Sequence, residues 1–560
     1  MFHLKPFLFF SSKKNEINLK DKYIFSTVKK NQTFYIEKVN SYLSELNISN
    51  ANYFWWAFNL SSKNPLSSSF VYKMTDILAS LDLDRNETFK NTDYSGFSIA
   101  QQKILNECIG SNEGFYQKTT FFLSQSFKIV FDFVKATLRI FQILCFFLFR
   151  KINKNKHNIL IFTFVDGSNR DEKDPYFGNL KNLISKEDSN KFVGYLYYLY
   201  RPFFKMAKTL EKEKPPHNYI FSYLKPQDYF WCFTQIIKVY FFKVKKVQFL
   251  YNNKPVSLEK LVRETMLSEI SRGLIENLLL FCAFKRLNSN KFLEKIIYPF
   301  ENKSLEKLLL LGLSSNIKTI GYQHSSITPR HLSFKLSKRE IKITPLPDKI
   351  ITLGKITHKW LVEKGNFPSQ KVNPGVALRS FNNKYFNKTS FNPNKAKLLF
   401  VFSSSLNEII KTIDLLKDIS NTHSFIYKFK FHINFPMSSL EQEYQDWINK
   451  KVDFISSDSL YNEFRWADIM IYISSSAVLE SLMCHLPVIR LDLDKLNSNP
   501  LLNFKPSLFK EVKSSKDFIK SVFEISYLSD DEKNDMALSS KKFAESYMVP
   551  QENFNSKMFF

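Results

Sequence analysis

The chain has 560 residues, 44% of them hydrophobic and 24% charged, a length that suits about two to four domains. This composition excludes a wholly disordered chain, a collagen-like repeat and a polytopic membrane protein. The 80 Lys and Arg residues outnumber the 53 Asp and Glu residues, which gives a formal net charge of +27. Such a charge predicts an anionic partner, whether phospholipid, phosphorylated ligand or nucleic acid. The coding bias of an AT-rich genome, which enriches Lys, Asn, Ile and Phe, is the alternative source of the charge.

The five cysteines are scattered, without a C-x-x-C pair or a Cys/His ligand spacing. An odd number without such spacing argues against a disulfide framework and a structural zinc site, so we expect a cytoplasmic protein. The first fifteen residues contain only a short apolar run and do not resemble a signal peptide.

Residues 1–125 are predicted to form a mainly helical extension, with helical patterns at 33–46 and 70–81. The following segment, 126–149, is dense in Phe, Ile, Leu and Val. Its charged residues are spaced by four, three and four positions and therefore fall on one helical stripe: Lys128, Asp132, Lys135 and Arg139.

The uncharged run 140–149 is too short to span the roughly 30 Å of membrane hydrocarbon. Four basic residues follow it: Arg150, Lys151, Lys154 and Lys156. We therefore predict that 126–156 forms an amphipathic helix on the surface of an anionic membrane. A buried core helix and a membrane-spanning helix are the alternatives.

From residue 157 short apolar runs alternate with amphipathic stretches, which is the pattern of parallel βαβ units. The first series has strands predicted at 158–166, 192–200, 295–301, 318–324 and 348–354, with helical stretches at 228–245 and 257–285. The second has strands predicted at 397–402, 425–431, 452–457, 468–474 and 487–493, with helices at 406–419, 439–450, 458–466 and 476–484.

These two series predict an α/β fold of two doubly wound Rossmann-like domains that follow the helical extension. The N-terminal domain is expected at 157–380, the C-terminal domain at 397–560, and a linker rich in Asn, Lys and Ser at 381–396. Open α/β sheets bind ligands at the carboxyl ends of their strands, so the functional site is expected in the cleft between the domains.

In the first series, Glu301 and His324 end two predicted strands and would face this cleft. Glu301 could orient His324, which could then take a proton from an acceptor hydroxyl. A structural histidine that satisfies loop carbonyls is the alternative. Other residues of the same loop could hold sugar hydroxyls or phosphate: Gln323, Ser325, Ser326, Arg330 and His331.

In the second series, residues 467–491 predict a strand, a serine-rich turn, a short helix and another strand. The serines Ser474, Ser475 and Ser476 fall at the start of the helix, where free N–H groups and hydroxyls can hold a phosphate. Glu480, one turn further on, could accept hydrogen bonds from a ribose diol. A helix-capping serine cluster followed by a solvated glutamate explains the same residues.

Lys430 and His432 follow each other closely at the end of the predicted strand 425–431. A cation and an imidazole at a strand end suit a diphosphate or phosphodiester leaving group. A basic strand end in a lysine-rich protein is the alternative. The serine run 403–405 after the strand 397–402 is a further, less specific candidate for an anion loop.

The segment 474–489, with its S-S-x-x-x-x-E helix and P-V-I strand, resembles the nucleotide-binding half of GT-B glycosyltransferases, although His485 stands where glycine is usual. Lys430-Phe431-His432 resembles the K-P-H-P turn of capsule and teichoic-acid-type transferases, without the prolines. The E-N pair at 301–302 and the sequence GYQHS at 321–325 resemble a family of bacterial surface-carbohydrate biosynthesis proteins. That resemblance also includes FWWAFNLSSKNP at 54–65 and PGVALR at 374–379, and spans about residues 50–500.

The resemblance implies a glycosyltransferase that uses a nucleotide-sugar donor and needs no metal or other cofactor. We expect an inverting reaction on a surface polysaccharide or lipid-linked glycan, at the inner face of the cytoplasmic membrane. A polyol-phosphate transferase and a non-catalytic glycan-binding or assembly protein are the alternatives. A nucleic-acid binder would explain the charge but not the polar strand ends.

The sequence Asp492-Leu493-Asp494 could form a D-x-D metal site, although a strand-end turn is the simpler interpretation.

Overall fold

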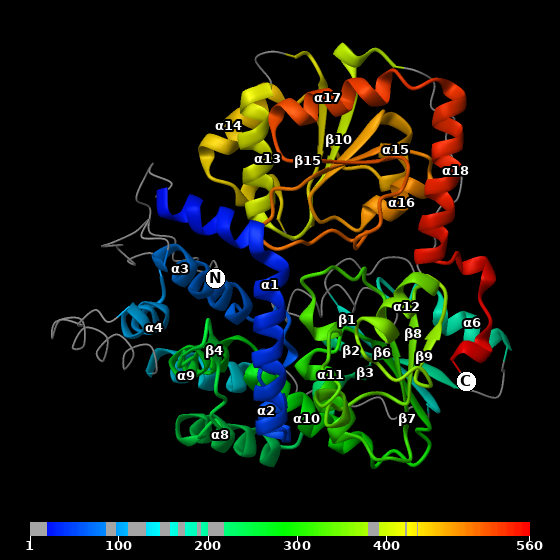
Figure 1. Ribbon diagram of the computed structural model, residues 1–560. Coiled ribbons are helices and arrows are strands. Elements are labelled where there is room, and N and C mark those ends of the chain that lie inside the picture. The colour runs from blue at the N-terminus through cyan, green and yellow to red at the C-terminus, as the bar shows by residue number, and fades with distance from the viewer. Residues whose placement is uncertain are drawn as a thin grey trace.

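The computed structural model describes residues 19–85, 97–109, 130–145, 157–165, 174–187, 192–199, 218–378, 391–419, 423–433 and 435–559. Two parallel sheets lie one above the other in Figure 1, with the second domain above the first. The helices of the N-terminal extension flank the first domain on one side. The predicted fold class, two doubly wound α/β domains with a helical extension, is confirmed.

The first sheet has the strand order β3-β2-β1-β6-β7-β8-β9, and every neighbouring pair is parallel. The strand Ile159–Val165, ILIFTFV, is apolar except for Thr163, and every residue is buried because helices cover both faces of such a sheet. The strands are β1 (Ile159–Val165), β2 (Val193–Leu199), β3 (Asn218–Tyr219), β6 (Lys295–Pro299), β7 (Lys318–Tyr322), β8 (Lys349–Thr352) and β9 (Val372–Pro374).

The second sheet has the parallel order β12-β11-β10-β13-β14-β15. Alternate residues of its strands face opposite layers, since Ile469 and Ile471 pack in a separate core with Ile413 and Phe518, whereas Met470 and Tyr472 belong to the main core. The strands are β10 (Lys397–Val401), β11 (Ile426–Lys430), β12 (Phe454–Ile455), β13 (Ile469–Tyr472), β14 (Val488–Leu491) and β15 (Phe509–Val512).

Each strand predicted from an apolar run is present, with ends within two residues of the prediction, because a buried parallel strand needs a continuous apolar sequence. The short strands β3, β9 and β15 and the hairpin of β4 (Leu250–Tyr251) and β5 (Lys254–Pro255) were not predicted. Of the predicted linker 381–396, only 391–396 falls within the described residues.

Helices complete both domains. Those of the first domain are α6 (Leu180–Glu187), α8 (Pro226–Phe241), α9 (Glu259–Glu269), α10 (Ile275–Leu287), α11 (Ser304–Gly312) and α12 (Lys355–Glu363), with a π-helical turn at Ile270–Leu274. Those around the second are α13 (Leu406–Ile419), α14 (Gln442–Lys451), α15 (Leu460–Trp466), α16 (Ala477–Met483), α17 (Ser515–Ser526) and α18 (Asp530–Tyr547).

The N-terminal extension contains α1 (Leu19–Asn50), α2 (Tyr53–Trp56), α3 (Phe70–Arg85) and α4 (Ile99–Ile109). In Figure 1 the long helix α1 runs from the level of the second domain down along the first, with a break in helical geometry at Asn31. Ser44 and Asn47, in its second half, donate hydrogen bonds of 2.8 and 2.7 Å to the buried carboxylate of Glu340 in the first domain. The extension is therefore packed into the body of the protein.

The segment after α18 returns from the second domain to the first. Val549 exchanges backbone hydrogen bonds of 2.9 and 2.8 Å with Leu353 and Ala377 of the first domain. A side chain at Gly354 would lie 2.7 Å from the carbonyl oxygens of Ser546 and Tyr547, so only glycine permits this approach. The last described residues, within the range predicted for the C-terminal domain, thus pack against the first sheet.

Of the predicted membrane-surface helix 126–156, residues 130–145 are described, and they are helical. Asp132 and Arg139, from its charged stripe, are buried against the protein, whereas Lys135 is exposed. No helix within the described part of the chain is long and apolar enough to cross a membrane.

Candidate functional site

Glu301 and His324 lie side by side at one edge of the first sheet. The strands before them, β6 and β7, are adjacent and parallel, so their carboxyl ends meet at the same edge. Nε2 of His324 lies 3.4 Å from Oε1 of Glu301, and the two side chains are 7% and 19% exposed. The predicted pair is therefore brought together, in a largely buried position.

The environment of Glu301 keeps its carboxylate ionised. Burial opposes ionisation, but the positive charge of Lys303 and the proximity of His324 outweigh it and lower the pKa of Glu301 to about 2. Lys303 also forms an ion pair with the other oxygen of this carboxylate. The ring of Tyr176 meets the His324 ring edge-on at 4.8 Å. The ionised Glu301 carboxylate can therefore orient the imidazole ring.

The remaining polar residues of this loop have different surroundings. Gln323 is fully buried, and its amide bonds the backbone of Ser325 and Leu353. Ser325 and Ser326 are partly exposed. His331 accepts a 3.3 Å hydrogen bond from the Thr328 N–H at Nδ1. Within this loop, the two serines are accessible, whereas Gln323 holds the backbone in shape.

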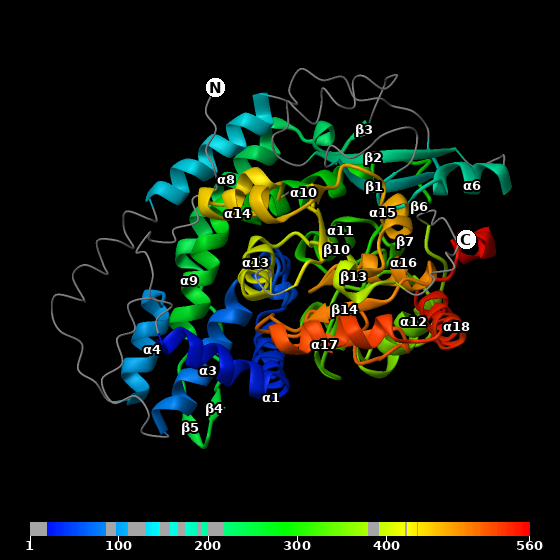
Figure 2. The same cartoon turned by 90° about the horizontal axis from the view of Figure 1, so that it is seen from above.

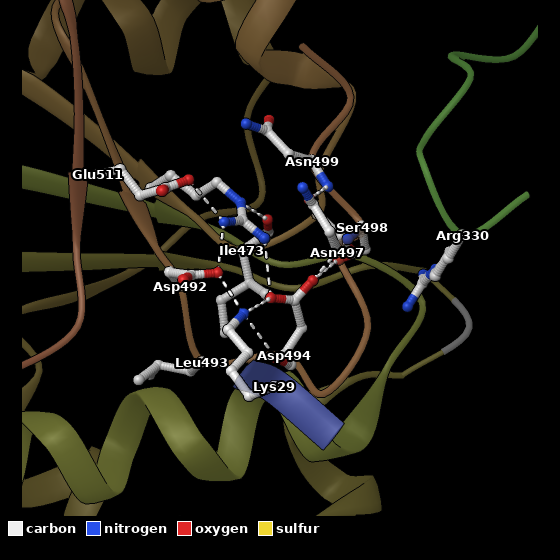
Figure 3. Close-up of polar contacts among 12 residues, drawn as sticks. Lys29, Arg330, Ile473, Asp492, Leu493, Asp494, Asn497, Ser498, Asn499 and Glu511 are labelled. Carbon is white, nitrogen blue, oxygen red and sulfur yellow. Dashed lines mark hydrogen bonds and ion pairs between the residues drawn. The ribbon is translucent and has the colours of Figure 1, made fainter. Parts of the chain in front are cut away.

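Arg330 connects this loop to the second domain. Its backbone N–H donates a 3.2 Å hydrogen bond to the carbonyl of Asn497, which follows β14. Its guanidinium reaches the Tyr72 hydroxyl at 3.3 Å. Figure 3 shows the side chain pointing toward the second domain, across from Asn497 and Ser498. Loops that follow strands of the two sheets therefore contact each other at this point.

In the second domain, two serines converge at the point where the strand order reverses. Ser403 follows β10 and Ser474 follows β13, the adjacent strands at which the chain switches from one side of the sheet to the other. Both hydroxyls donate to the buried carboxylate of Glu408, at 2.7 and 2.5 Å. A switch point of this kind is where doubly wound sheets bind ligands.

Glu408 was not predicted, although it lies in the first turn of α13, five residues after Ser403. Burial raises its pKa, while the hydrogen bonds from both serines and the charge of Arg330 act in the opposite direction. The Glu408 carboxylate therefore links the two serine turns by hydrogen bonds. The positive charge of Arg330, in the other domain, favours its ionised form. A lone glutamate in an amphipathic helix carries no sequence signal for this role.

Lys430 and His432 lie at the end of β11, next to β10 in the sheet. Nζ of Lys430 donates hydrogen bonds of 3.2 and 2.5 Å to Ser456 Oγ and the Asp458 carbonyl, and burial lowers the pKa of this lysine. His432 is partly exposed. Lys430 and His432 therefore share the sheet edge of Ser403 and Ser474, with Lys430 partly engaged by the protein.

The other predicted donor residues lie on or beside α16. Ser475 is buried, Ser476 is exposed, and Glu480 is partly exposed. The helix ends in a regular C-terminal motif, in which the N–H groups of His485 and Leu486 bond the carbonyls of Leu482 and Ser481 at 3.2 and 3.0 Å. His485 takes the left-handed conformation, with φ 64°. The backbone therefore has the conformation that glycine favours at this position, although the residue is histidine.

The D-x-D sequence is engaged in ion pairs (Figure 3). Arg490, 1% exposed, lies 2.7 Å from Asp492 and 2.8 Å from Asp494. Lys29 of α1 lies 2.5 Å from Asp492 and 3.2 Å from Asp494. The cations outweigh the effect of burial and lower the pKa of Asp494 to about 2. Among the residues that the structure describes, no group of three or more His, Cys, Asp or Glu side chains is arranged to hold a metal ion.

No family model and no curated protein matches the chain. Solved structures do, at low identity. Anabaena Alr3699/HepE in complex with UDP and glucose is 10% identical, with a TM-score of 0.39 over 72% of this chain and 98% of the other. The lipopolysaccharide outer core galactosyltransferase WaaB in its apo form is 13% identical, with the same coverages and TM-score. The UDP-GlcNAc 2-epimerase from Neisseria meningitidis bound to UDP-GlcNAc is 10% identical, with a TM-score of 0.39 over 70% and 98%.

Proposed function

We propose that the protein is a glycosyltransferase that moves a sugar from a nucleotide-activated donor to a surface polysaccharide or a lipid-linked glycan. The observation that carries this proposal is the 3.4 Å pair of Glu301 and His324, at a sheet edge that faces the strand-end serines of the second domain. The reaction would take place at the inner face of the cytoplasmic membrane.

The donor would bind to the second domain. Its diphosphate would lie against the serine turns after β10 and β13, where hydroxyl and backbone N–H groups can donate hydrogen bonds. Lys430 and His432 would stabilise the negative charge that develops on the leaving diphosphate. Glu480 would accept hydrogen bonds from the ribose hydroxyls. Glu408, which holds Ser403 and Ser474, would position this site without touching the donor.

The acceptor would bind to the first domain, where Ser325, Ser326 and Arg330 offer polar contacts. His324 would take the proton of the acceptor hydroxyl, and Glu301 would stabilise the imidazolium that results. The acceptor oxygen would then bond to the anomeric carbon as the bond from that carbon to the diphosphate oxygen breaks. This displacement inverts the anomeric configuration. Because the His324 side chain is 7% exposed, the acceptor gains access only when the surrounding side chains move.

We propose that this reaction uses no metal, because Arg490 and Lys29 already pair with the carboxylates of the D-x-D sequence. Lys430 and His432 would neutralise the leaving group instead. Turnover in the presence of EDTA should equal turnover without it. Loss of turnover in EDTA and its recovery with Mn²⁺ would contradict a metal-independent reaction.

The test is a transfer assay with a panel of nucleotide sugars and glycan acceptors. The His324→Ala variant should lose turnover by at least about a hundredfold, the range expected for loss of a general base. His358→Ala, on helix α12 of the same domain, is the matched control and should keep wild-type turnover. A fully active His324→Ala variant would remove this residue from the mechanism.

A non-catalytic glycan-binding protein is the second candidate, and one observation favours it. The ammonium group of Lys430 is bonded to Ser456 and Asp458, which reduces its capacity to neutralise a leaving group. This candidate predicts glycan binding without release of nucleotide from any donor. A polyol-phosphate transferase would instead leave a phosphodiester in the product, so product analysis separates the three.

A further inference from the structure

The helix at residues 130–145 buries Ala136, Ile140 and Ile143 and presents a second apolar face to solvent. Phe131, Val134, Leu138 and Phe141 follow at spacings of three, four and three, which places them on one helical face. They are 58%, 47%, 55% and 62% exposed, and Val130 beside them is 61% exposed. A surface helix of a globular protein ordinarily turns such a face to the core.

Two charged side chains on the buried face of this helix also hold it to the protein. Asp132 is buried and accepts a 2.7 Å hydrogen bond from Ser271. Arg139 is buried and bonds Glu276, at 2.7 and 2.9 Å. Because these contacts fix which face of the helix points inward, the exposure of the apolar face is built into the packing.

Helix α8 extends the apolar surface. Phe230, Ile237 and Phe241 are 72%, 41% and 77% exposed, and their spacing of seven and four places them on one face. The rings of Phe133 and Phe233 join the two helices at 5.5 Å. Figure 2 shows the cyan helix of residues 130–145 beside α8 at the outer edge of the molecule. Neither the exposure of α8 nor this pairing was predicted.

The exposed charges of the two helices have one sign. The carboxylates of residues 130–145 and 226–241 are Asp132 and Asp228, and both are buried, the latter 2.8 Å from Arg286. The exposed charged residues of the two helices are Lys135 and Lys238. Three more exposed lysines follow α8: Lys243, Lys245 and Lys246, of which Lys246 pairs with Glu259 at 3.0 Å.

We propose that residues 130–145 and α8 together form a surface that docks on an anionic lipid bilayer. The four exposed phenylalanines enter the boundary between headgroups and acyl chains, while the lysines contact the headgroup phosphates. A surface of apolar side chains and cations, on two helices that carry no exposed carboxylate, is complementary to anionic lipid. This inference specifies the proposed membrane location and does not depend on which reaction the protein catalyses.

Co-sedimentation of the full chain with vesicles tests the proposal. The wild type should bind vesicles of phosphatidylcholine and phosphatidylglycerol in equal parts and should bind phosphatidylcholine alone weakly, because the lysines need anionic headgroups. The quadruple variant Phe131→Ser, Phe141→Ser, Phe230→Ser, Phe241→Ser should partition into the anionic vesicles at least about tenfold less. The control variant Phe292→Ser, Phe504→Ser removes two exposed phenylalanines elsewhere and should bind as the wild type does.

Thermal unfolding of both variants shows whether they are folded, and Lys135→Glu, Lys238→Glu provides a second test that leaves the apolar face intact. This charge variant should also lose anionic vesicle binding. The proposal is overturned if wild type does not bind, or if the folded quadruple variant binds as wild type does. A wild-type dimer in solution that the quadruple variant abolishes, without vesicle binding, would assign the surface to a second copy. Nucleotide binding measured without vesicles reports on the proposed function separately.

Discussion

Lys29 in the first half of α1 lies 2.5 Å from Asp492 of the second domain, 463 residues further along the chain. Its ammonium group also donates a 2.9 Å hydrogen bond to the carbonyl of Asp494. The second half of the same helix is bonded to Glu340 of the first domain. One helix thus contacts both domains, on either side of its break at Asn31.

Replacing Lys29 should release the first half of α1 from the second domain. In the Lys29→Met variant, the largely buried carboxylates of Asp492 and Asp494 lose one of their cationic partners. We therefore expect a loss of about 1–3 kcal/mol in unfolding free energy. Amide hydrogen exchange should accelerate at residues 22–30. It should stay slow at 35–50, because this half of the helix is hydrogen-bonded to Glu340. Lys30→Met, at the exposed next position, is the control. Unchanged exchange at 22–30 would show that the ion pair does not fasten the helix.

Glu408 should support donor binding through the two serines that it holds. The Glu408→Ala variant removes the acceptor of both hydroxyls, so we expect nucleotide affinity to fall about tenfold. Glu408→Gln keeps the side-chain volume and a carbonyl acceptor and should stay within about threefold of wild type. Calorimetric titration measures both. Equal affinities for the Ala variant and wild type would contradict a positioning role.

His331 should make the protein less stable in mild acid. Burial, with the charges of Arg330 and Lys303, lowers its pKa to about 3, although Glu301 opposes them. The folded state therefore binds fewer protons than the unfolded chain, whose histidine has a pKa of about 6.5. The contribution of neutral His331 to the free energy of unfolding is fully present above that pKa. It decreases toward pH 3, by about 2 kcal/mol between pH 7 and pH 5.

Substitution isolates this effect. In His331→Asn the side-chain carbonyl can accept the Thr328 N–H without titrating, so denaturant unfolding should lose about 2 kcal/mol of its pH dependence between pH 7 and pH 5. A variant with the full wild-type dependence would assign the acid sensitivity to other groups.

The left-handed residue after α16 gives a comparison between two substitutions. At φ 64° an alanine side chain is disfavoured and glycine is not. Both His485→Gly and His485→Ala lose the imidazole, so the difference between them reports the backbone alone. We expect the Gly variant to be more stable than the Ala variant by about 1 kcal/mol in thermal or denaturant unfolding. Equal stability would mean that the turn relaxes in one of them.

Sequence predicted those parts of the structure that depend on local patterns. Buried parallel strands need continuous apolar runs, and such runs predicted β1 and β10. The helical spacing of apolar residues predicted α13. The pairing of Glu301 with His324 followed from two polar residues at the ends of adjacent strands.

The features that were missed depend on contacts between distant residues. No local pattern links Lys29 to Asp492, or Glu408 to Ser474 across 66 residues. The charged stripe of residues 130–145 was found, but the side that faces the protein is set by Ser271 and Glu276, which lie on another element. Gln323 was predicted to contact a ligand, but its side-chain amide is buried and bonds the backbone. The amino-acid sequence does not distinguish these two roles of a glutamine.

The donor site is the central claim, and calorimetric titration of the purified protein with CMP, UDP, GDP and CDP tests it most directly. We predict that one nucleotide binds in the micromolar range, that Glu480→Ala abolishes this binding, and that His324→Ala keeps it. Absence of binding by all four nucleotides, or an unchanged affinity in Glu480→Ala, would contradict the claim.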